Sequence, residues 1–300
     1  MKEAVCKILA GNGDRVKKSI QDFDTIDLVG SGECDVYAIT KGKQKTFLKI
    51  KRANSCTNFK VEAFVLKSLR ALNAKVPDVI KQSANFIITS ENQGECLNDR
   101  PHLFLKKSIY EGLSEDLRKF YKIKFNGFGA IENTHGVHQE WIYFFDGVKP
   151  WAKTIKNRSL ADVKSVEILE KYWRKNSLLL GGVKNSYLVH GDFCTDHIFA
   201  YKGSYSGIID FGDAFAGDPL IDLAYFKFKE ITKPYGLKTF RFLKNAYGKF
   251  LTIGSNETKL INLYMIYWAL RRVVESNDFD TAKTFAQKLE RLAKDLAADV

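Results

Sequence analysis

The chain has 300 residues, of which 45% are hydrophobic and 13% aromatic, enough to fill the core of one large domain or of two lobes that share a cleft. This composition excludes an intrinsically disordered chain. The formal net charge is +12, but residues 1–93 and the remainder contribute equally to it. A nucleic-acid surface concentrates its basic residues on one face, so no nucleic-acid partner is expected.

The cysteines and the apolar runs indicate in which cellular compartment the protein is expected. Five scattered cysteines without a Cys-x-x-Cys pair argue against a disulfide framework or a structural zinc site, so we expect a cytoplasmic protein, as a monomer. The apolar stretch within the first fifteen residues is interrupted by Lys7 and is too short for the core of a signal peptide. The longest uncharged apolar run, Leu263 to Leu270, is far shorter than a membrane-spanning helix. No membrane segment is expected.

The first elements in chain order form a hairpin. Thr25 to Val29 alternates like a strand, Gly30, Ser31 and Gly32 follow, and Cys34 to Thr40 returns before a polar turn. The glycines and serine form a candidate phosphate-covering loop. A Gly-Ser-Gly turn is also commonplace between strands, so an ordinary hairpin turn stays open as the alternative.

Lys49 and Glu62 form the next candidate pair. Thr46 to Lys51 reads as a third strand in which Lys49 projects opposite Leu48 and Ile50, able to meet nucleotide phosphates. Residues 58–72 have apolar side chains at helical spacing, with Glu62 in the first turn. We expect an ion pair between the two. The alternative is an exposed Glu62 that pairs within its own helix.

A boundary between two lobes is expected near residue 93. Asn85 to Thr89 reads as an edge strand, and residues 89–94 as a hinge whose backbone at Ser90, Glu91 and Asn92 contacts a nucleotide base. Residues 1–93 would form a nucleotide-binding lobe and residues 94–300 a catalytic, acceptor-binding lobe. Backbone contacts do not separate ATP from GTP.

Beyond the hinge the chain becomes helical. Ser114 and Ser159 read as helix caps, and Leu160 to Leu180 has helical spacing. Three tryptophans are expected to pack this lobe rather than to stack on a substrate: Trp141, Trp151 and Trp173.

The most informative segment is residues 190–213, HGDFCTDHIFAYKGSYSGIIDFGD. Tyr187 to Val189 would end a strand, residues 190–197 would form a loop, and Ile198 to Tyr201 and Gly207 to Asp210 would pair around a polar turn. This hairpin returns Asp210 beside the loop. Kinases use such an arrangement to hold a catalytic Asp beside magnesium.

The roles follow from the side-chain chemistry. Asp192 would accept the proton of a substrate hydroxyl, and Asp210 would bind Mg²⁺ through a carboxylate oxygen. His197 is a softer and therefore weaker ligand for this hard cation. Cys194 has no dedicated base beyond His190 and His197, so a nucleophilic role is disfavoured. The tripeptides His-Gly-Asp (190–192) and Asp-Phe-Gly (210–212) each occur by chance in unrelated proteins. The prediction depends on their joint spacing.

Three more helices are expected at 237–250, 257–275 and 281–297, with Asp280 as the cap of the last. Asp218 and Asp222, at the start of the preceding helix, are expected to be structural. No Ala-Pro-Glu segment or long activation loop follows Asp210, which argues against a protein kinase. The polar catalytic positions are intact, which argues against a regulatory pseudokinase.

HGDFCTDHIF followed by GIIDFGDAFAGDPLIDLAYF resembles the aminoglycoside phosphotransferase and choline kinase-like family. SGECDVYAIT, FLKIKRANS, NGFGAIE and NLYMIYWALRRVVESNDFDTAKTF are similar to its hygromycin B phosphotransferases. The resemblance implies an α+β, two-lobed, protein-kinase-like fold with a small antiparallel-sheet N-lobe and a larger, mainly helical C-lobe. It also implies transfer from ATP or GTP, with Mg²⁺, to a small hydroxylated acceptor. His197 departs from the commoner Asn, which affects the metal-ligand assignment and not the reaction.

An aminoglycoside-like or other sugar-bearing acceptor is the first expectation, with antibiotic resistance as its possible role. A polycation requires a carboxylate-lined pocket, for which the candidates are Asp213, Glu230, Glu275, Asp278 and Asp280. If Lys and Arg line the site instead, a neutral or anionic sugar or metabolite fits better. A choline, homoserine or sugar kinase is therefore the alternative.

Overall fold

The chain folds as two compact units, Met1–Gln93 and Gly94–Val300. The structure is a computed structural model that describes residues 24–53, 55, 57–100, 102–103, 105–132, 134–276 and 278–300. The apolar stretch near Lys7 and the cysteines at 6 and 56 lie outside these residues. Cys34, Cys96 and Cys194, which lie within them, are free thiols.

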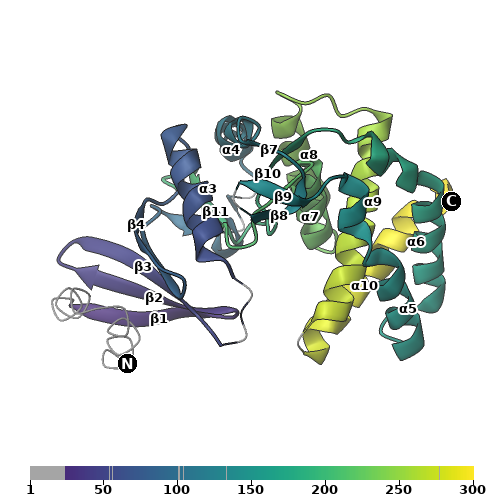
Figure 1. Cartoon of the computed structure of the whole chain (residues 1–300), viewed down its shortest axis with the longest axis horizontal. Helices are drawn as coiled ribbons and strands as arrows, with labels where there is room; N and C mark the ends of the chain where they lie inside the picture. The colour runs from purple at the N-terminus through teal and green to yellow at the C-terminus, as the bar shows by residue number, and fades with distance from the viewer. Residues whose placement is uncertain are drawn as a thin grey trace. The chain divides into compact units, whose positions relative to one another are not determined.

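Within the described residues, the N-terminal unit is an antiparallel sheet with one helix beside it (Figure 1). The sheet order is β1-β2-β3-β5-β4. Ile26, Ile39, Leu48, Ile50 and Phe86 form its core cluster. The strands and the helix are β1 (Thr25–Ser31), β2 (Cys34–Lys41), β3 (Gln44–Lys51), β4 (Val79–Gln82), β5 (Phe86–Ser90) and α3 (Phe59–Ala71).

Two expectations for this sheet are wrong. The strand expected as an edge, at 85–89, is the inner strand β5, because the short β4 pairs outside it and the Ser90 hydroxyl accepts the Asp78 N–H at 2.8 Å. The first strand does not end at Val29. It continues through Gly30 to Ser31 with a register shift at Gly30, as glycine permits at a bulge, and the turn is reduced to residues 32 and 33.

The C-terminal unit contains two antiparallel sheets, of order β7-β10-β13-β8-β9 and β12-β11-β6. The strands of the first are β7 (Lys124–Phe125), β8 (Phe128–Glu132), β9 (His135–His138), β10 (Ser186–Val189) and β13 (Phe215–Gly217). Those of the second are β6 (Glu95–Cys96), β11 (Ile198–Tyr201) and β12 (Ser204–Ile208). Loop 190–197 connects the two sheets, running from β10 to β11.

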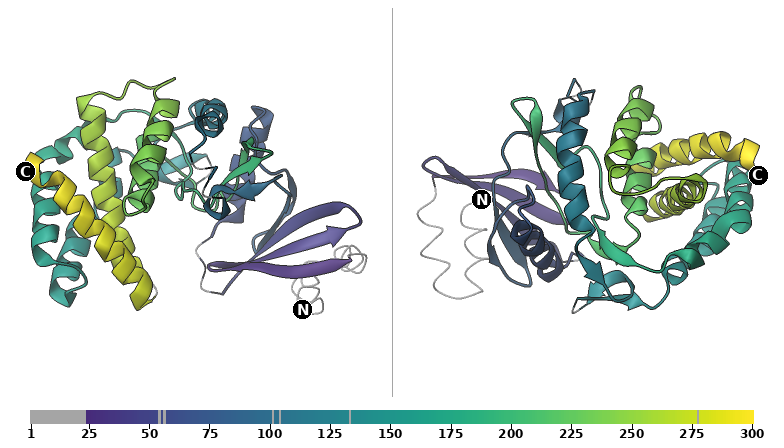
Figure 2. Two further views of the ribbon diagram at one scale, coloured as in Figure 1. Left: turned by 180° about the vertical axis from the view of Figure 1, so that it is seen from behind. Right: turned by 90° about the horizontal axis from the view of Figure 1, so that it is seen from above.

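Helices make up most of this unit, and α9 lies at their centre (Figures 1 and 2). Every residue from Leu260 to Leu270 is buried, because α9 packs against α5, α6, α7 and α10. None of the helices in the described residues has the length and apolarity needed to cross a membrane. The helices are α4 (Lys107–Phe120), α5 (Val148–Arg158), α6 (Val163–Asn176), α7 (Leu220–Glu230), α8 (Gly236–Tyr247), α9 (Ser255–Glu275) and α10 (Phe279–Leu296).

Three expected caps are wrong. Ser114 lies inside α4, where its hydroxyl donates to the Glu111 carbonyl. Ser159 ends α5 in the left-handed conformation, and Asp162 caps α6 instead. Asp280 lies in the first turn of α10, because the Asp278 side chain accepts the Thr281 N–H at 2.8 Å. Helix periodicity does not distinguish capping residues that lie two or three positions apart.

The predicted role of the tryptophans is confirmed. Trp141 and Trp173 are buried, and Trp151 packs its ring 5.5 Å from that of Tyr267 on α9. Trp141 also donates its indole N–H to the Tyr264 hydroxyl, which in turn donates to Asp218. The hydrogen bonds of Trp141, Tyr264 and Asp218 thus connect α9 to the segment that follows β13.

Candidate active site

Loop 190–197 is fixed at its start by Asp222 of α7. The two carboxylate oxygens accept the backbone N–H groups of His190 at 2.8 Å and Gly191 at 3.0 Å. Burial raises the pKa of Asp222 to about 7, although these two hydrogen bonds favour the charged form. The expected structural role of Asp222 is therefore that of a loop anchor.

His190 ties the loop to the segment that carries Asp210. Its Nε2 donates to the Ile209 carbonyl at 2.9 Å, and its Nδ1 accepts the Asp192 N–H at 3.3 Å. Burial, reinforced by the positive charge of His197, lowers the pKa of His190 to about 4. The imidazole is neutral at physiological pH and acts as a fixed bridge between two backbone segments.

Asp192 presents an ionised carboxylate. Its side chain is 26% exposed, and its Oδ1 lies 3.4 Å from Nη2 of Arg272. Burial opposes ionisation, but the charge of His197, a hydrogen bond from Tyr225 and the charge of Arg272 outweigh it and lower the pKa of Asp192. This carboxylate can accept a hydrogen bond and a proton from a hydroxyl group.

His197 and Asp210 meet at the other end of the loop. Nδ1 of His197 donates to the Asp192 carbonyl at 2.8 Å, which turns Nε2 toward Asp210, whose Oδ2 is 3.8 Å away. Burial disfavours the imidazolium, but the Cys194 sulfur and the carboxylates of Asp210 and Asp192 raise the pKa of His197 to about 10. The loop and the hairpin thus bring Asp192, His197 and Asp210 together.

The hairpin that carries Asp210 differs from the expected one. β12 runs from Ser204 to Ile208 instead of 207–210, and its turn consists of Lys202 and Gly203, both with positive φ, as the twist of a two-residue hairpin favours. Asp210 lies after the strand with a φ of 67°. That conformation ends the ladder and directs the chain back to the loop.

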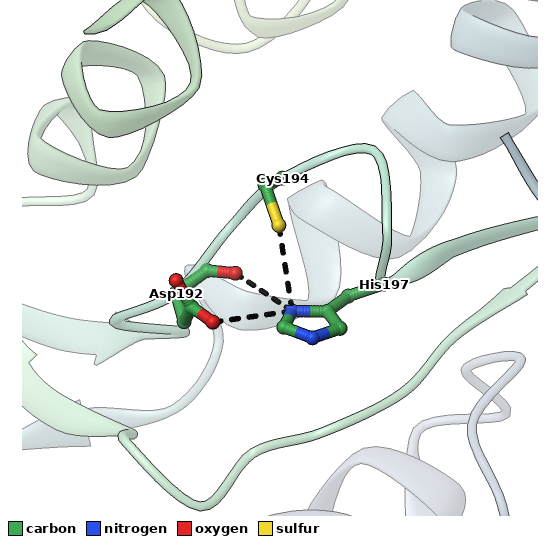
Figure 3. A group of neighbouring side chains, drawn as sticks. All are labelled: Asp192, Cys194 and His197. Atoms are coloured by element: carbon green, nitrogen blue, oxygen red, sulfur yellow. Dashed lines mark hydrogen bonds and ion pairs between the residues drawn. The ribbon is translucent and has the colours of Figure 1, made fainter. Parts of the chain in front are cut away.

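Figure 3 shows Asp192, Cys194 and His197 as one cluster. The Cys194 sulfur lies 3.7 Å from Nδ1 of His197, and the potential ligand atoms of the three residues lie within 4.8 Å of one another. Cys194 is buried, so its thiol is not placed to attack a substrate. The disfavoured nucleophilic role therefore gains no support.

Asp210 fits a magnesium ion better than His197 does. Its side chain is 41% exposed and offers the oxygen ligand that Mg²⁺ prefers. A metal at Nε2 of His197 would have to displace the proton that the neighbouring carboxylates hold there. The ligand roles of both residues stay predictions.

The expected pair forms in the N-terminal unit. Nζ of Lys49 lies 2.8 Å from Oε1 of Glu62, whose side chain is 2% exposed. The alternative, an exposed Glu62 paired within its own helix, is therefore excluded. The contact of Lys49 with nucleotide phosphates stays a prediction.

The candidate phosphate-covering loop is stabilised by charged side chains. The Ser31 hydroxyl donates to Asp35 at 3.0 Å and accepts from Arg52, which also pairs with Asp35 at 2.6 Å. Gly30 belongs to β1, and a Cβ at Gly32 would meet nothing within 4 Å. The local backbone therefore does not require glycine at position 32.

Two of the three candidate hinge residues have structural partners. The backbone N–H of Ser90 donates to the Asp78 carbonyl at 2.9 Å, and Glu91 lies 3.5 Å from Lys45. The amide nitrogen of Asn92 is buried and has no hydrogen-bond partner among the described residues. The contacts of Ser90, Glu91 and Asn92 with a base stay predictions.

The five acids expected to line a pocket for a polycationic acceptor do not form one cluster, and three of them have other partners. Asp213 and Glu230 adjoin the loop, but the Glu230 carboxylate is buried and pairs with Lys233 at 2.8 Å. Glu275 pairs with Arg271 at 2.7 Å. Asp278 and Asp280 belong to the start of α10, where the Asp278 carboxylate is a helix cap.

Sequence reasoning missed the residues that surround Asp192. Tyr225 of α7 and Arg272 of α9 hydrogen-bond each other at 2.8 Å, next to the carboxylate. The guanidinium also lies over the Trp268 ring, 5.7 Å from its centroid. The available signal was a pair of arginines directly after the apolar run that ends at Leu270.

Known proteins share this architecture. The family model of the phosphotransferase enzyme family (APH) matches residues 25–252. A curated relative, "Probable aminoglycoside 3'-phosphotransferase" of Lactococcus lactis subsp. lactis (strain IL1403), is 24% identical over 216 residues, which cover 70% of this chain and 78% of the relative.

Two solved structures are similar in fold. A thermostable mutant of aminoglycoside phosphotransferase APH(4)-Ia, in a ternary complex with AMP-PNP and hygromycin B, has a TM-score of 0.73 at 16% identity, covering 93% of this chain and 96% of that one. The gentamicin complex of APH(2")-IIa has a TM-score of 0.65 at 17% identity, covering 94% and 95%. The predicted two-lobed, protein-kinase-like fold is confirmed. With three quarters of its length matched by one family model, the chain belongs to the phosphotransferase enzyme family.

Proposed function

We propose that this chain transfers the γ-phosphoryl group of a nucleoside triphosphate to a hydroxyl of a small, sugar-bearing acceptor of the aminoglycoside type. The observation that carries the proposal is the carboxylate of Asp192, held by an anchored loop in which His197 lies between it and Asp210. The names of the relatives support the acceptor class. Antibiotic resistance is the corresponding physiological role, and a cytoplasmic location is proposed with it.

The donor side is assigned to the N-terminal unit. Lys49, oriented by Glu62, neutralises the phosphates, and residues 30–32, at the end of β1 and the start of the turn, cover them. The backbone of residues 90–92 contacts the base. The AMP-PNP complex of APH(4)-Ia supports a nucleoside triphosphate as the donor, and ATP and GTP are both candidates.

Asp210, with His197 as the weaker partner, would hold Mg²⁺. The ion would supply positive charge at the phosphates of the donor, where negative charge develops during transfer. The exposed carboxylate of Asp210 supports this assignment.

The acceptor hydroxyl donates a hydrogen bond to Asp192, which orients its oxygen and takes its proton as transfer proceeds. A bond forms between this oxygen and the γ-phosphorus, and the bond from that phosphorus to the bridging oxygen of the β-phosphate breaks. The products are a phosphate monoester and a nucleoside diphosphate. Positioning and electrostatics supply most of the catalysis in this chemistry.

The test is a coupled assay of nucleoside diphosphate release, with ATP and GTP as donors. The acceptors are aminoglycosides, macrolides, choline, homoserine and simple sugars, and mass spectrometry checks each product for one added phosphoryl group. Asp192→Asn is the control for background hydrolysis. Turnover that occurs with a protein substrate and with no small hydroxyl compound would contradict the proposal.

A kinase of a neutral or anionic metabolite is the second candidate. The observation that favours it is the cation beside the catalytic carboxylate, Arg272, in the position where an acid would be expected for a polycationic acceptor.

A further inference from the structure

Arg272 is held in one orientation. Its guanidinium lies 5.2 Å from the ring centroid of Tyr225 and 5.7 Å from that of Trp268, and its Nη2 donates to the Tyr225 hydroxyl at 2.8 Å. Contacts with two aromatic faces and a hydrogen bond leave little freedom for the side chain. The cation is therefore a fixed part of the surface next to Asp192.

The guanidinium has unused hydrogen-bond donors. Within the described residues, its Nη2 makes the hydrogen bonds of the group, to Tyr225 and Asp192, which leaves Nη1 without a partner. The side chain is 32% exposed, so a ligand can reach it. An arginine with free donors binds oxygen groups in a planar, directional way.

Two further basic side chains act on the Asp192 carboxylate: Arg272 and Lys229. Asp213 is the acid that acts on Arg272 besides Asp192 itself. An ammonium group beside the reacting hydroxyl would meet these cations at close range, which costs binding energy.

We propose that Arg272 is an acceptor-binding residue, which selects a hydroxyl whose neighbouring substituents are oxygen groups, carboxylate above all, and rejects a hydroxyl that is flanked by ammonium. This inference rests on the proposed function, since it names the acceptor chemistry of the same site. For a polyfunctional sugar, the rule also fixes the position of phosphorylation. The reacting hydroxyl is the one on the oxygen-rich side of the molecule.

The test uses three sugars that share a ring and differ in one substituent: glucuronate, glucose and glucosamine. The full-length wild-type chain is expected to have its highest kcat/KM with glucuronate and its lowest with glucosamine, about tenfold or more apart. Arg272→Gln should bring the three values within about threefold of one another. Arg272→Lys should keep the order, because it keeps the charge.

Arg271→Gln is the matched control. It removes the same charge from the adjacent position of α9, but Arg271 pairs with Glu275 and Tyr267 and not with Asp192. We expect it to retain the wild-type order of the sugars. A general defect in folding or turnover lowers all three values alike, so the ratio reports on acceptor recognition.

The possible outcomes separate the two proposals. If the wild type prefers glucosamine, if it phosphorylates aminoglycosides but none of the three sugars, or if Arg272→Gln retains the wild-type order, the inference is wrong while the kinase activity stands. If the wild type phosphorylates none of the sugars and no aminoglycoside with either donor, the proposed function fails and the inference fails with it. The expected order, lost in Arg272→Gln and kept in Arg271→Gln, supports the inference and the kinase activity.

Discussion

Acid should destabilise the C-terminal unit through His190. The imidazole is buried and neutral, with both ring nitrogens in hydrogen bonds to backbone groups. Protonation would turn Nδ1 from an acceptor of the Asp192 N–H into a second donor, so it would break that bond and leave a charge away from water. The folded unit therefore resists a proton that the unfolded chain accepts readily.

The size of the effect follows from the two pKa values. The pKa of His190 falls from 6.5 in the free side chain to about 4 in the folded unit. Because the unfolded state binds the proton at the higher pH, this stability is present above pH 6.5 and is lost as the pH falls toward 4. The loss in the free energy of unfolding amounts to about 2 kcal/mol at pH 5 and about 3 kcal/mol at pH 4.

Urea unfolding followed by tryptophan fluorescence measures this loss in the correct unit. All four tryptophans of the chain lie between residues 94 and 300: Trp141, Trp151, Trp173 and Trp268. The comparison is between the wild type and His190→Gln, each at pH 8 and pH 5. Glutamine can still donate to the Ile209 carbonyl but does not titrate.

The wild type should lose about 2 kcal/mol more than His190→Gln between the two pH values. Titrating groups that are distant from His190 contribute equally to both proteins and cancel in the difference. Equal losses in the two proteins would refute the reasoning, since they would mean that His190 takes up its proton as readily in the folded state as in the unfolded one.

Three further predictions concern the site directly. Asp192→Asn should reduce phosphoryl transfer by at least about 10²-fold and leave nucleotide affinity nearly unchanged; steady-state kinetics and calorimetry measure the two, and wild-type turnover would eliminate this residue as the base. His197→Asn should retain appreciable activity in a magnesium titration whereas Asp210→Ala should not, because an amide can replace an imidazole at a metal but a methyl group cannot replace a carboxylate; equal inactivity of two folded variants would give His197 another role. Lys49→Ala removes the cation 2.8 Å from the buried Glu62 carboxylate, which should destabilise the N-terminal unit by about 3 kcal/mol and weaken nucleotide binding. Adding Glu62→Gln should restore the stability measured by thermal unfolding but not the nucleotide binding. Recovery of both would contradict the phosphate-binding role of Lys49.

The bounds of the loop and strand at residues 190–201 were predictable, because the residues of the motif also determine the local backbone structure. The strand Ile198–Tyr201 has the predicted bounds, and the loop before it runs from His190 to His197 as expected. The pair of Lys49 and Glu62 was also predictable, since a strand alternation and a helical first turn each fix one partner. Both are local sequence patterns, which specify local structure without contacts from distant parts of the chain.

The remaining features depend on contacts between distant parts of the chain. Asp192 and Arg272 are 80 positions apart, and no periodicity connects them. The conformation of Asp210, with its positive φ, was not visible either, because Asp is one of the few non-glycine residues that tolerate it. The short β4 gave too few residues for an alternation, so its neighbour was read as an edge.

With the proposed roles of Asp192 and Arg272, helix α7 would link reaction rate to acceptor choice. Asp222 holds the start of the loop, and Tyr225, three residues later on the same face of the helix, supports the guanidinium beside Asp192. A substitution that moves α7 to admit a different acceptor therefore also moves the anchor of the loop that carries Asp192. Broadening the acceptor range through this helix should reduce turnover, whereas changes on α9 can alter selectivity and leave the anchor in place.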